Sequence, residues 1–377
     1  MLKLRASYGT NGNQNISAAN YGFPSLLTSS NLIRETIASA NGYNNTPASL
    51  LYGNFDNVNV QWEKITQANF GVDFIVFNDR LEGNIDVYNK TTSNLFNSIP
   101  NSAVVGTGFS VAGNNGELTN NGVELQLKYN VIKNEKMRFS VFANSSYNEN
   151  KITALAETNQ SGVSNLRQVG NILNEWNLIP YVGVNQANGN LLFLDRNNNL
   201  TETPDDAKDR RATGKSNLPK YQGGFGFNFD YKGFYLNTLF TYMYDVWRID
   251  NQFRWASDPS FIGQDNVTAD LLDQWTPTNS NATVPAINAF NHTISSSSDR
   301  FLYDSSFIRL KNINLGYNIP SKMLKNSPFT NVKFFILAEN LLTWTKWRGF
   351  DPEAVSALSV TNFPNPKTIT FGTTIGF

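Results

Sequence analysis

The chain is 377 residues long, and its 30 basic residues balance its 30 acidic residues, which gives a net charge of +0. This balance gives no reason to expect nucleic acid as a partner. The absence of cysteine excludes disulfides, thiolate metal sites and cysteine nucleophiles, and the single histidine, His292, excludes most histidine-based catalysis and multi-histidine zinc sites.

The composition combines many aromatic residues with many uncharged polar ones. Aromatic residues make up 13% of the chain and charged residues 16%, while the mean hydropathy is -0.36. This combination is typical of strands that face lipid on one side and water on the other. No apolar run approaches the ~18 residues that a transmembrane helix needs. The N-terminal residues lack the apolar core of a signal peptide, so we expect the chain to be a fragment of a longer exported protein.

Ten segments predict β-strands because apolar and polar residues alternate along them with a period of two. In residues 67–76, for example, Phe70 and Phe74 alternate with Asn69 and Asp73. The same alternation marks residues 123–131, 225–231 and 368–377. The predicted strands span residues 2–10, 66–77, 81–92, 120–131, 137–150, 221–231, 234–247, 304–319, 332–344 and 367–377.

Short and long connections alternate between these predicted strands. The short connections hold residues 78–80, 133–135, 232–233 and 320–330, and the long ones lie near 11–65, 93–119, 151–220, 248–303 and 345–366. Short turns at one rim and long loops at the other are typical of outer-membrane β-barrels, whose short turns are periplasmic. The sequence therefore predicts an all-β fold, a transmembrane antiparallel β-barrel with long extracellular loops and a periplasmic C-terminus.

Alternation alone does not exclude a soluble β-sandwich, because the strands of a sandwich also alternate. The polar faces carry Glu, Lys, Gln and Asn, while the apolar faces carry several large aromatics, which favours lipid outside and a watery lumen inside. The strand at 304–319 changes parity, with Ile308 and Leu310 at even positions and Ile313 and Leu315 at odd ones. A β-bulge near Lys311 restores a single lipid face. The alternative is a strand that begins only at Lys311.

Several phrases of the chain resemble those of SusC/RagA-type TonB-dependent transporters. They are residues 59–77, which hold Trp62-Glu63-Lys64, with the following hairpin residues 80–92, and residues 113–127, 303–320 and 338–353. The resemblance implies that residues 1–377 are the C-terminal portion of a barrel of 22 strands, about the last ten of them. The plug domain and the TonB box of the family are absent from this chain, and the sheet is incomplete without the N-terminal half.

The resemblance implies a non-enzymatic role in the active import of a nutrient of the oligosaccharide or peptide class. The expected partners are a SusD-like surface lipoprotein, the TonB complex through the missing N-terminal part, outer-membrane lipid and the nutrient ligand. Two other functions stay open, a passive outer-membrane porin or adhesin and a soluble glycan-binding β-sandwich. No residue is expected to carry a chemical step.

Residues 195–206 are the one stretch with ligand chemistry. Oxygen-bearing side chains stand at 195, 197, 199, 201, 203 and 206, which is the spacing of an EF-hand-like calcium loop. Leu200 stands where glycine normally makes the sharp turn, so a solvated Asn/Asp turn is the alternative. The candidate calcium ligands are Asp195, Asn197, Asn199, Thr201 and Asp206, and no other cofactor is expected.

The tryptophans fall into two groups. Trp62, Trp247, Trp344 and Trp347 lie near predicted strand ends, where indole suits the membrane interface, although stacking on sugar rings also recruits such residues. The other group lies within the long connections and is a candidate for contact with the substrate or with the surface lipoprotein. Local packing within the loops is the alternative for this group, which comprises Trp176, Trp255 and Trp275.

Overall fold

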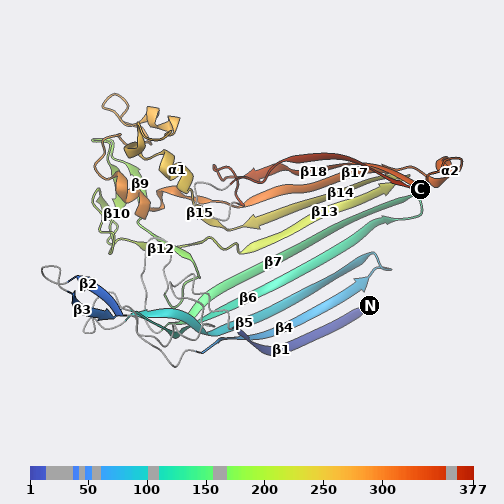
Figure 1. The fold of residues 1–377 in the computed structure, drawn as a ribbon, viewed down its shortest axis with the longest axis horizontal. Coiled ribbons are helices and arrows are strands. Elements are labelled where there is room, and N and C mark those ends of the chain that lie inside the picture. Colours follow the sequence, from blue (N-terminus) through green and yellow to red (C-terminus); the bar gives the residue numbers. More distant parts are fainter. Residues whose placement is uncertain (14–36, 42–46, 53–60, 101–109, 156–167, 354–362) are drawn as a thin grey trace.

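The computed structural model describes residues 1–13, 37–41, 47–52, 61–100, 110–155, 168–353 and 363–377. Ten strands form one curved antiparallel sheet, in which each strand pairs with the strands before and after it in this series (Figure 1). They are β1 (Leu2–Asn13), β4 (Glu63–Val76), β5 (Leu81–Pro100), β6 (Ser110–Lys133), β7 (Met137–Leu155), β13 (Tyr221–Tyr231), β14 (Phe234–Tyr244), β17 (Phe307–Asn318), β18 (Asn331–Thr345) and β19 (Thr368–Gly376).

The prediction of ten antiparallel strands in chain order is confirmed, and with it the fold class of a partial barrel wall. The predicted long connection at 93–119 is wrong in extent, because β5 continues to Pro100 and β6 begins at Ser110. At ~3.3 Å per residue, the 24 residues of β6 span roughly 80 Å. A membrane strand needs only ~9–11 residues, so β5 and β6 extend well beyond the thickness of a bilayer.

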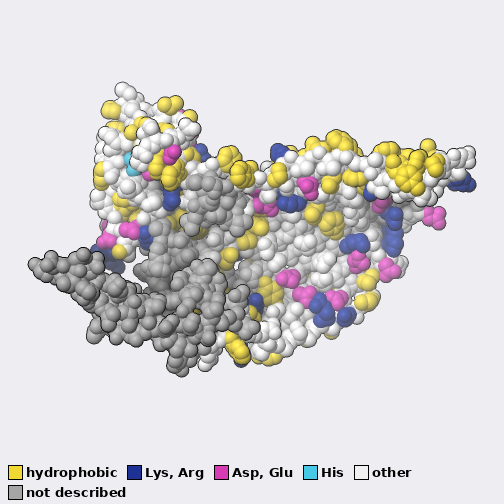
Figure 2. All heavy atoms as spheres, viewed as in Figure 1, with side chains coloured by type: hydrophobic (Ala, Val, Ile, Leu, Met, Phe, Trp, Pro, Cys, Tyr) yellow, Lys and Arg dark blue, Asp and Glu magenta, His cyan; other side chains and the backbone are white. Residues whose placement is uncertain are grey.

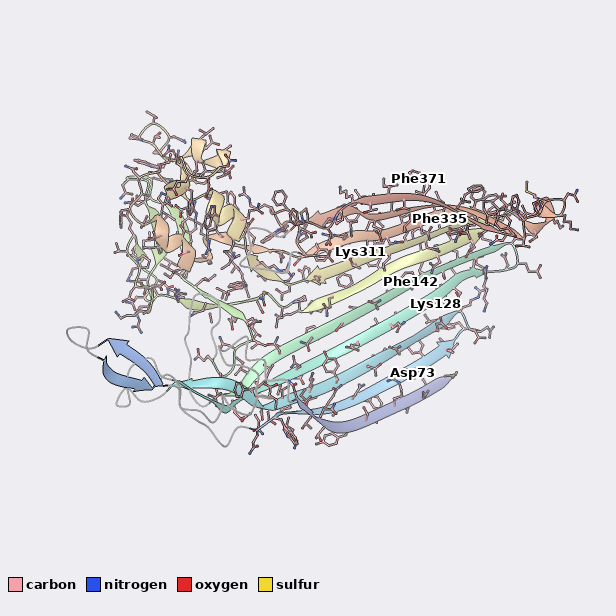
Figure 3. The ribbon with its side chains drawn as sticks, in the orientation of Figure 1. Asp73, Lys128, Phe142, Lys311, Phe335 and Phe371 are labelled. Carbon is pink, nitrogen blue, oxygen red and sulfur yellow. The ribbon has the colours of Figure 1, made fainter. Side chains whose placement is uncertain are left out.

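One face of the sheet is apolar and exposed. The side chains of Phe70 on β4 and Phe371 on β19 are 52% and 75% exposed, and Figure 3 labels Phe371. Leu125 and Phe227 on the same face are half-buried among their strand neighbours. In the described part of the chain no second sheet pairs with or packs over this face, as a soluble β-sandwich requires. The sandwich alternative is therefore wrong.

The strand at 304–319 contains the β-bulge that its change of parity predicted. The register against β14 shifts where Leu239 and Phe240 face Asn312 and Leu310, which leaves Lys311 as the extra residue. Ile308 and Leu315 consequently lie on the same exposed face despite their opposite parity. The alternative of a strand that begins at Lys311 is wrong, because β17 begins at Phe307.

The long connections 168–220 and 245–306 fold together into one unit, which we call the loop cap, beside the long-loop rim of the sheet (Figure 1). Trp176 and Leu178 of the first connection pack against Ile249, Phe301 and Leu302 of the second. The cap comprises β8 (Glu175–Leu178), β9 (Tyr181–Val184), β10 (Leu191–Leu194), β11 (Leu200–Thr201), β12 (Arg211–Ser216), β15 (Trp247–Ile249), α1 (Asn251–Ala256), η4 (Pro259–Phe261), η5 (Ala269–Asp273), η6 (His292–Ser297), η7 (Asp299–Phe301) and β16 (Leu302–Asp304).

The cap corrects two predicted strand ends. Trp247 belongs to β15 and Asp304 to β16, which pair with each other in the cap and not with the ten-stranded sheet. The remaining elements are the hairpin of β2 (Ile37–Asn41) and β3 (Pro47–Tyr52), and α2 (Ser321–Leu324) between β17 and β18. Within the described residues, no helix has both the length and the apolar character needed to cross a membrane.

The ladder between β13 and β14 is interrupted at Gly226 and Phe227. Pairing runs from Phe225 with Phe240 directly to Asn228 with Asn237. The Thr238 hydroxyl fills the gap by accepting a hydrogen bond from the Phe227 N–H at 3.1 Å. A Cβ atom on Gly226 would collide with the carbonyl oxygen of Thr238, so only glycine fits at this point.

We expect Gly226→Ala to lower the free energy of unfolding by about 1–3 kcal/mol, because the new methyl group must displace backbone. Gly9→Ala in β1 is the matched control, since a Cβ there meets no heavy atom within 4 Å. Thermal or urea unfolding of the two variants in detergent measures the difference. Equal midpoints for Gly226→Ala and Gly9→Ala would contradict this account of the ladder.

Candidate functional site

The polar face of the sheet carries three hollows, of about 440, 510 and 620 Å³. The first two share Gln126 and Asn144. The second and third share Glu124 and Gln222. The hollows are therefore contiguous, and we call them together the polar groove. It runs over β4 to β7, β13 and β14, from the short-turn rim towards the loop cap (Figure 2).

The charges near the short-turn end of the groove are paired. The Arg5 guanidinium donates to the Asp73 carboxylate at 2.8 Å and to that of Asp86 at 2.7 Å. Lys128 pairs with Glu82 at 2.7 Å on the neighbouring strands, and Figure 3 labels Asp73 and Lys128. Basic and acidic groups therefore alternate over this face, so the electrostatic potential of the wall is neither uniformly positive nor uniformly negative.

Nearer to the loop cap, amides and hydroxyls make up most of the groove lining, together with Asp86, Lys90 and Glu124. Tyr88 donates from its hydroxyl to Asn148 at 2.9 Å, and the Asn148 amide donates to Asn120 at 3.3 Å. Amide side chains both donate and accept hydrogen bonds, so this lining suits neutral polar ligand groups such as hydroxyls and peptide units. Across the described residues, no three His, Cys, Asp or Glu side chains are grouped so as to hold a metal ion.

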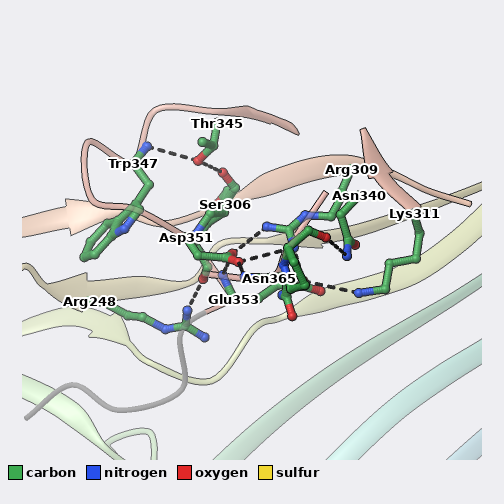
Figure 4. Close-up of polar contacts among 12 residues, drawn as sticks. Arg248, Ser306, Arg309, Lys311, Asn340, Thr345, Trp347, Asp351, Glu353 and Asn365 are labelled. Atoms are coloured by element: carbon green, nitrogen blue, oxygen red, sulfur yellow. Dashed lines mark hydrogen bonds and ion pairs between the residues drawn. The ribbon is translucent and has the colours of Figure 1, made fainter. Parts of the chain in front are cut away.

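A buried ion cluster ties the last long connection to the wall of the groove (Figure 4). Arg309 on β17 pairs with Asp351 at 2.5 Å and with Glu353 at 2.5 Å, and the side chains of Arg309 and Asp351 are only 3% and 5% exposed. Lys311, the bulge residue, lies 3.6 Å from the Glu353 carboxylate. Glu353 also lines the second hollow, so this anchor brings the connection into the groove.

The anchor also reaches the loop cap and the start of β19. Arg248 of β15 donates to the carbonyl oxygen of Pro352. The Asn365 N–H donates to Asp351 at 2.8 Å. Burial raises the pKa of Asp351, but the hydrogen bonds from Arg309 and from the Asn365 and Glu353 N–H groups outweigh burial and leave this pKa below its ordinary value. Asp351 is therefore charged at neutral pH.

The candidate calcium ligands lie in and after the turn between β10 and β11. The Asp195 carboxylate accepts the backbone N–H groups of Asn197 and Asn199 at 2.8 and 2.8 Å, and the Asn199 side-chain amide at 3.0 Å. These bonds, the Asn199 N–H first, hold the pKa of Asp195 below its ordinary value. Asn198 adopts a positive φ of 66° at the turn. Hydrogen-bond donors of the turn itself therefore already occupy the Asp195 carboxylate.

The other two candidate ligands have partners outside this turn. The Thr201 hydroxyl accepts the Thr203 N–H at 3.1 Å, and Asp206 pairs with Arg210 at 2.6 Å. The structure thus brings Asp195, Asn197 and Asn199 together and engages Asp206 with an arginine. Calcium binding by this loop stays a prediction.

The three tryptophans of the long connections have different environments. Trp176 is 4% exposed, and its indole N–H donates to the Trp247 carbonyl at 2.8 Å, so it packs the core of the cap. Trp275 donates to the Gln186 carbonyl at 3.0 Å and is half-buried. Trp255 is 45% exposed. Of the three, Trp255 presents the most surface for contact with a ligand or a partner.

The anchor and the hydrogen-bond network around Glu202 were not predicted from the sequence. Glu202 accepts side-chain amides from Asn185, Asn188 and Asn190 at 2.6, 2.7 and 2.8 Å. The run of asparagines was a usable signal for a turn. Arg309 and Asp351, by contrast, belong to different predicted elements, and nothing in the spacing indicated that they meet.

We expect Arg309→Met to lower the free energy of unfolding by about 3–5 kcal/mol, because it leaves the buried Asp351 carboxylate without its countercharge, whereas Glu353 keeps Lys311. Residues 346–353 and 363–367, the described parts of the connection between β18 and β19, should also become more sensitive to limited proteolysis. Lys128→Met is the matched control, because it removes an exposed pair worth ~1 kcal/mol or less. Similar small shifts in the melting temperatures of both variants would refute the anchoring role.

No protein-family model matches the chain. TonB-dependent receptor P3 of Formosa agariphila is 28% identical over 413 residues, which cover 100% of this chain and 39% of that protein. TonB-dependent receptor SusC of Bacteroides thetaiotaomicron is 25% identical over 100% of this chain and 37% of its own length. The chain thus spans about two fifths of the curated relatives that it matches.

The solved structures show the same similarity. The RagAB peptide importer in its open-open state superposes with a TM-score of 0.82 at 28% sequence identity, and the match covers 100% of this chain and 40% of that one. A second structure, of the RagAB peptide transporter, gives a TM-score of 0.81 at 28% identity. The similarity therefore extends over both the ten-stranded sheet and the loop cap.

Proposed function

We propose that this chain, which is homologous to the SusC/RagA-type TonB-dependent receptors and corresponds to the C-terminal part of their barrel, forms part of the wall and the extracellular loops of an outer-membrane nutrient importer. In this proposal residues 1–377 all belong to the C-terminal portion of the barrel, and TonB binds a segment outside these residues. The role is transport and not catalysis, in keeping with the receptor names of the relatives.

One observation carries the proposal, namely that a single sheet has an exposed apolar face and a polar groove on the other. An exposed apolar surface of this extent is stable in contact with hydrocarbon and costly in water. The paired charges and amides of the groove require water or a polar ligand. A barrel in the outer membrane, with lipid outside and a watery lumen inside, satisfies both faces.

The ligand in this proposal is a peptide or an oligosaccharide. The amides of the groove suit either a peptide or an oligosaccharide. One of the similar solved structures is named a peptide importer. A SusD-like surface lipoprotein covers the loop cap, where Trp255, Leu272 and Phe290 are exposed. The long loops are then extracellular and the C-terminus periplasmic, as the alternation of short and long connections predicts.

Uptake by intact cells tests this function. We expect labelled peptides or oligosaccharides to enter cells that carry the protein, and entry to stop when an uncoupler collapses the proton gradient, because TonB coupling draws on that gradient. A passive porin, the other candidate, admits the same ligands without energy. Uptake that persists after uncoupling would therefore favour the porin and contradict active import.

We expect Val123→Arg to impair assembly in the membrane, because a guanidinium on the lipid face is unfavourable, by up to about 4 kcal/mol at the bilayer midplane. Gln126→Arg is the matched control, since Gln126 lies on the same strand and faces the groove. Heat-modifiable migration of the protein extracted from membranes reports the folded fraction. Equal folded fractions for the two variants would show that Val123 does not face lipid.

A further inference from the structure

The loop cap contains a fourth hollow, of about 260 Å³, whose lining residues are distinct from those of the polar groove. It lies between α1, η4, η6 and η7. Its polar lining includes Arg254, Ser257, Asp258, His292 and Arg300, and the aromatic ring of Trp255 stands beside them. We call it the cap pocket.

In the described part of the chain neither arginine of the cap pocket lies within 4 Å of a carboxylate, although the charge of Asp258 acts on Arg254. Among the described residues, the Arg300 guanidinium donates only to the Ser295 hydroxyl, at 3.2 Å, and it stacks over the rings of Tyr181 and Phe301. Burial lowers the pKa of both Arg254 and Arg300, which is the mark of cations held partly out of water. Such charges are stabilised by an anion that pairs with them.

The net charge of the pocket suits a monoanion. Asp258 is the one acidic residue in the lining, and it caps η4 by accepting the Ser260 N–H at 2.9 Å. His292 bonds to the Ala286 carbonyl oxygen at 2.7 Å, and burial lowers its pKa, so the imidazole is neutral at pH 7. Two guanidinium groups against one carboxylate leave a net charge of +1.

The pocket also holds an unsatisfied donor. The side chain of Ser257 is only 5% exposed, and its hydroxyl has no hydrogen-bond partner among the described residues. Buried polar groups are nearly always hydrogen-bonded, so this hydroxyl calls for a water or a ligand oxygen as its partner. Trp255 adds an apolar plate, since its ring stacks on Phe261 with centroids 4.1 Å apart and planes 12° apart.

We propose that the cap pocket binds a carboxylate of the ligand, held by the guanidinium groups of Arg254 and Arg300 and by the Ser257 hydroxyl. Guanidinium is planar and presents paired N–H donors that match the two oxygens of a carboxylate. The carboxylate is the C-terminus of a peptide or the acid group of a uronate. This inference rests on the proposed import function for its natural ligand, whereas the binding chemistry does not depend on transport.

The test uses benzoate and benzamide as probes, because they share a ring that can contact Trp255 and differ in charge. Calorimetric titration of the native protein in detergent should show saturable binding of benzoate and none of benzamide. Arg254→Gln and Arg300→Gln should each weaken benzoate binding about tenfold or more, as expected for a lost hydrogen bond to a charged group. Arg348→Gln is the matched control, because Arg348 is an exposed arginine paired with Asp270 at 3.1 Å.

A second measurement needs no variant and so does not depend on their folding. Phenylglyoxal modifies accessible arginines, and peptide mass spectrometry reports each site. Benzoate should slow the modification of Arg254 and Arg300 and leave that of Arg348 unchanged. The proposal is overturned if benzoate fails to bind, if benzamide binds equally well, or if the Gln variants and the protection pattern show no effect.

Two further arms identify the source of the carboxylate. A peptide with a free C-terminus is compared with its amidated form, and a uronate oligosaccharide with its neutral counterpart; the charged member of the correct pair should bind at least tenfold tighter. Benzoate binding without energised uptake would keep this inference and contradict the import function. Energised uptake without benzoate binding would do the reverse.

Discussion

The constraint on which the structure depends is that one sheet separates two solvents. Hydrocarbon offers no hydrogen-bond partner, so neighbouring strands must satisfy one another's backbone groups. The pairing in chain order does so for the strands from β4 to β18, whereas β1 and β19 each keep one edge without a partner strand among the described residues. Because side chains alternate, a slip of one residue would move Phe70 or Val123 from the lipid face to the groove. Where the apolar residues of β17 change from even to odd positions, the bulge at Lys311 keeps them on the lipid face. The bulge residue itself, Lys311, lies 3.6 Å from the Glu353 carboxylate.

The constraint ends where the strands leave the membrane. Beyond that point either face can be polar, which explains why β5 and β6 continue through Asn-, Ser- and Gly-rich sequence. The connections there are stabilised by burial of their own, with Trp176 and Phe301 in one core and Phe193 and Ala289 in another. The Arg309 anchor connects the membrane part of the sheet with the connections beyond it, because Arg309 on β17 binds Asp351 and Glu353 of the last long connection.

The same reasoning explains what could be predicted from the sequence. The strands and their faces are local, since a period of two is visible within ten residues, and β13 was predicted with its observed bounds, Tyr221–Tyr231. The cap could not be predicted, because the contact of Trp176 with Phe301 joins distant segments that share no periodicity. The spacing at 195–206 indicated alternating oxygens, yet it could not show that backbone N–H groups and Arg210 would engage Asp195 and Asp206. The cap pocket was missed for the same reason as the cap, because Arg254 and Arg300 meet only through tertiary folding.

The charged side chains of the polar groove and of the cap pocket differ in whether they are already paired. In the groove, Arg5 and Lys128 are already neutralised by carboxylates of the wall, so a passing ligand gains little by displacing them. In the cap pocket, Arg254 and Arg300 form no such ion pairs, so the proposed ligand carboxylate would meet cations that folding has already removed partly from water. In the proposed importer, stronger binding in the cap pocket than along the groove would favour passage, because a ligand held strongly throughout the groove would not leave it.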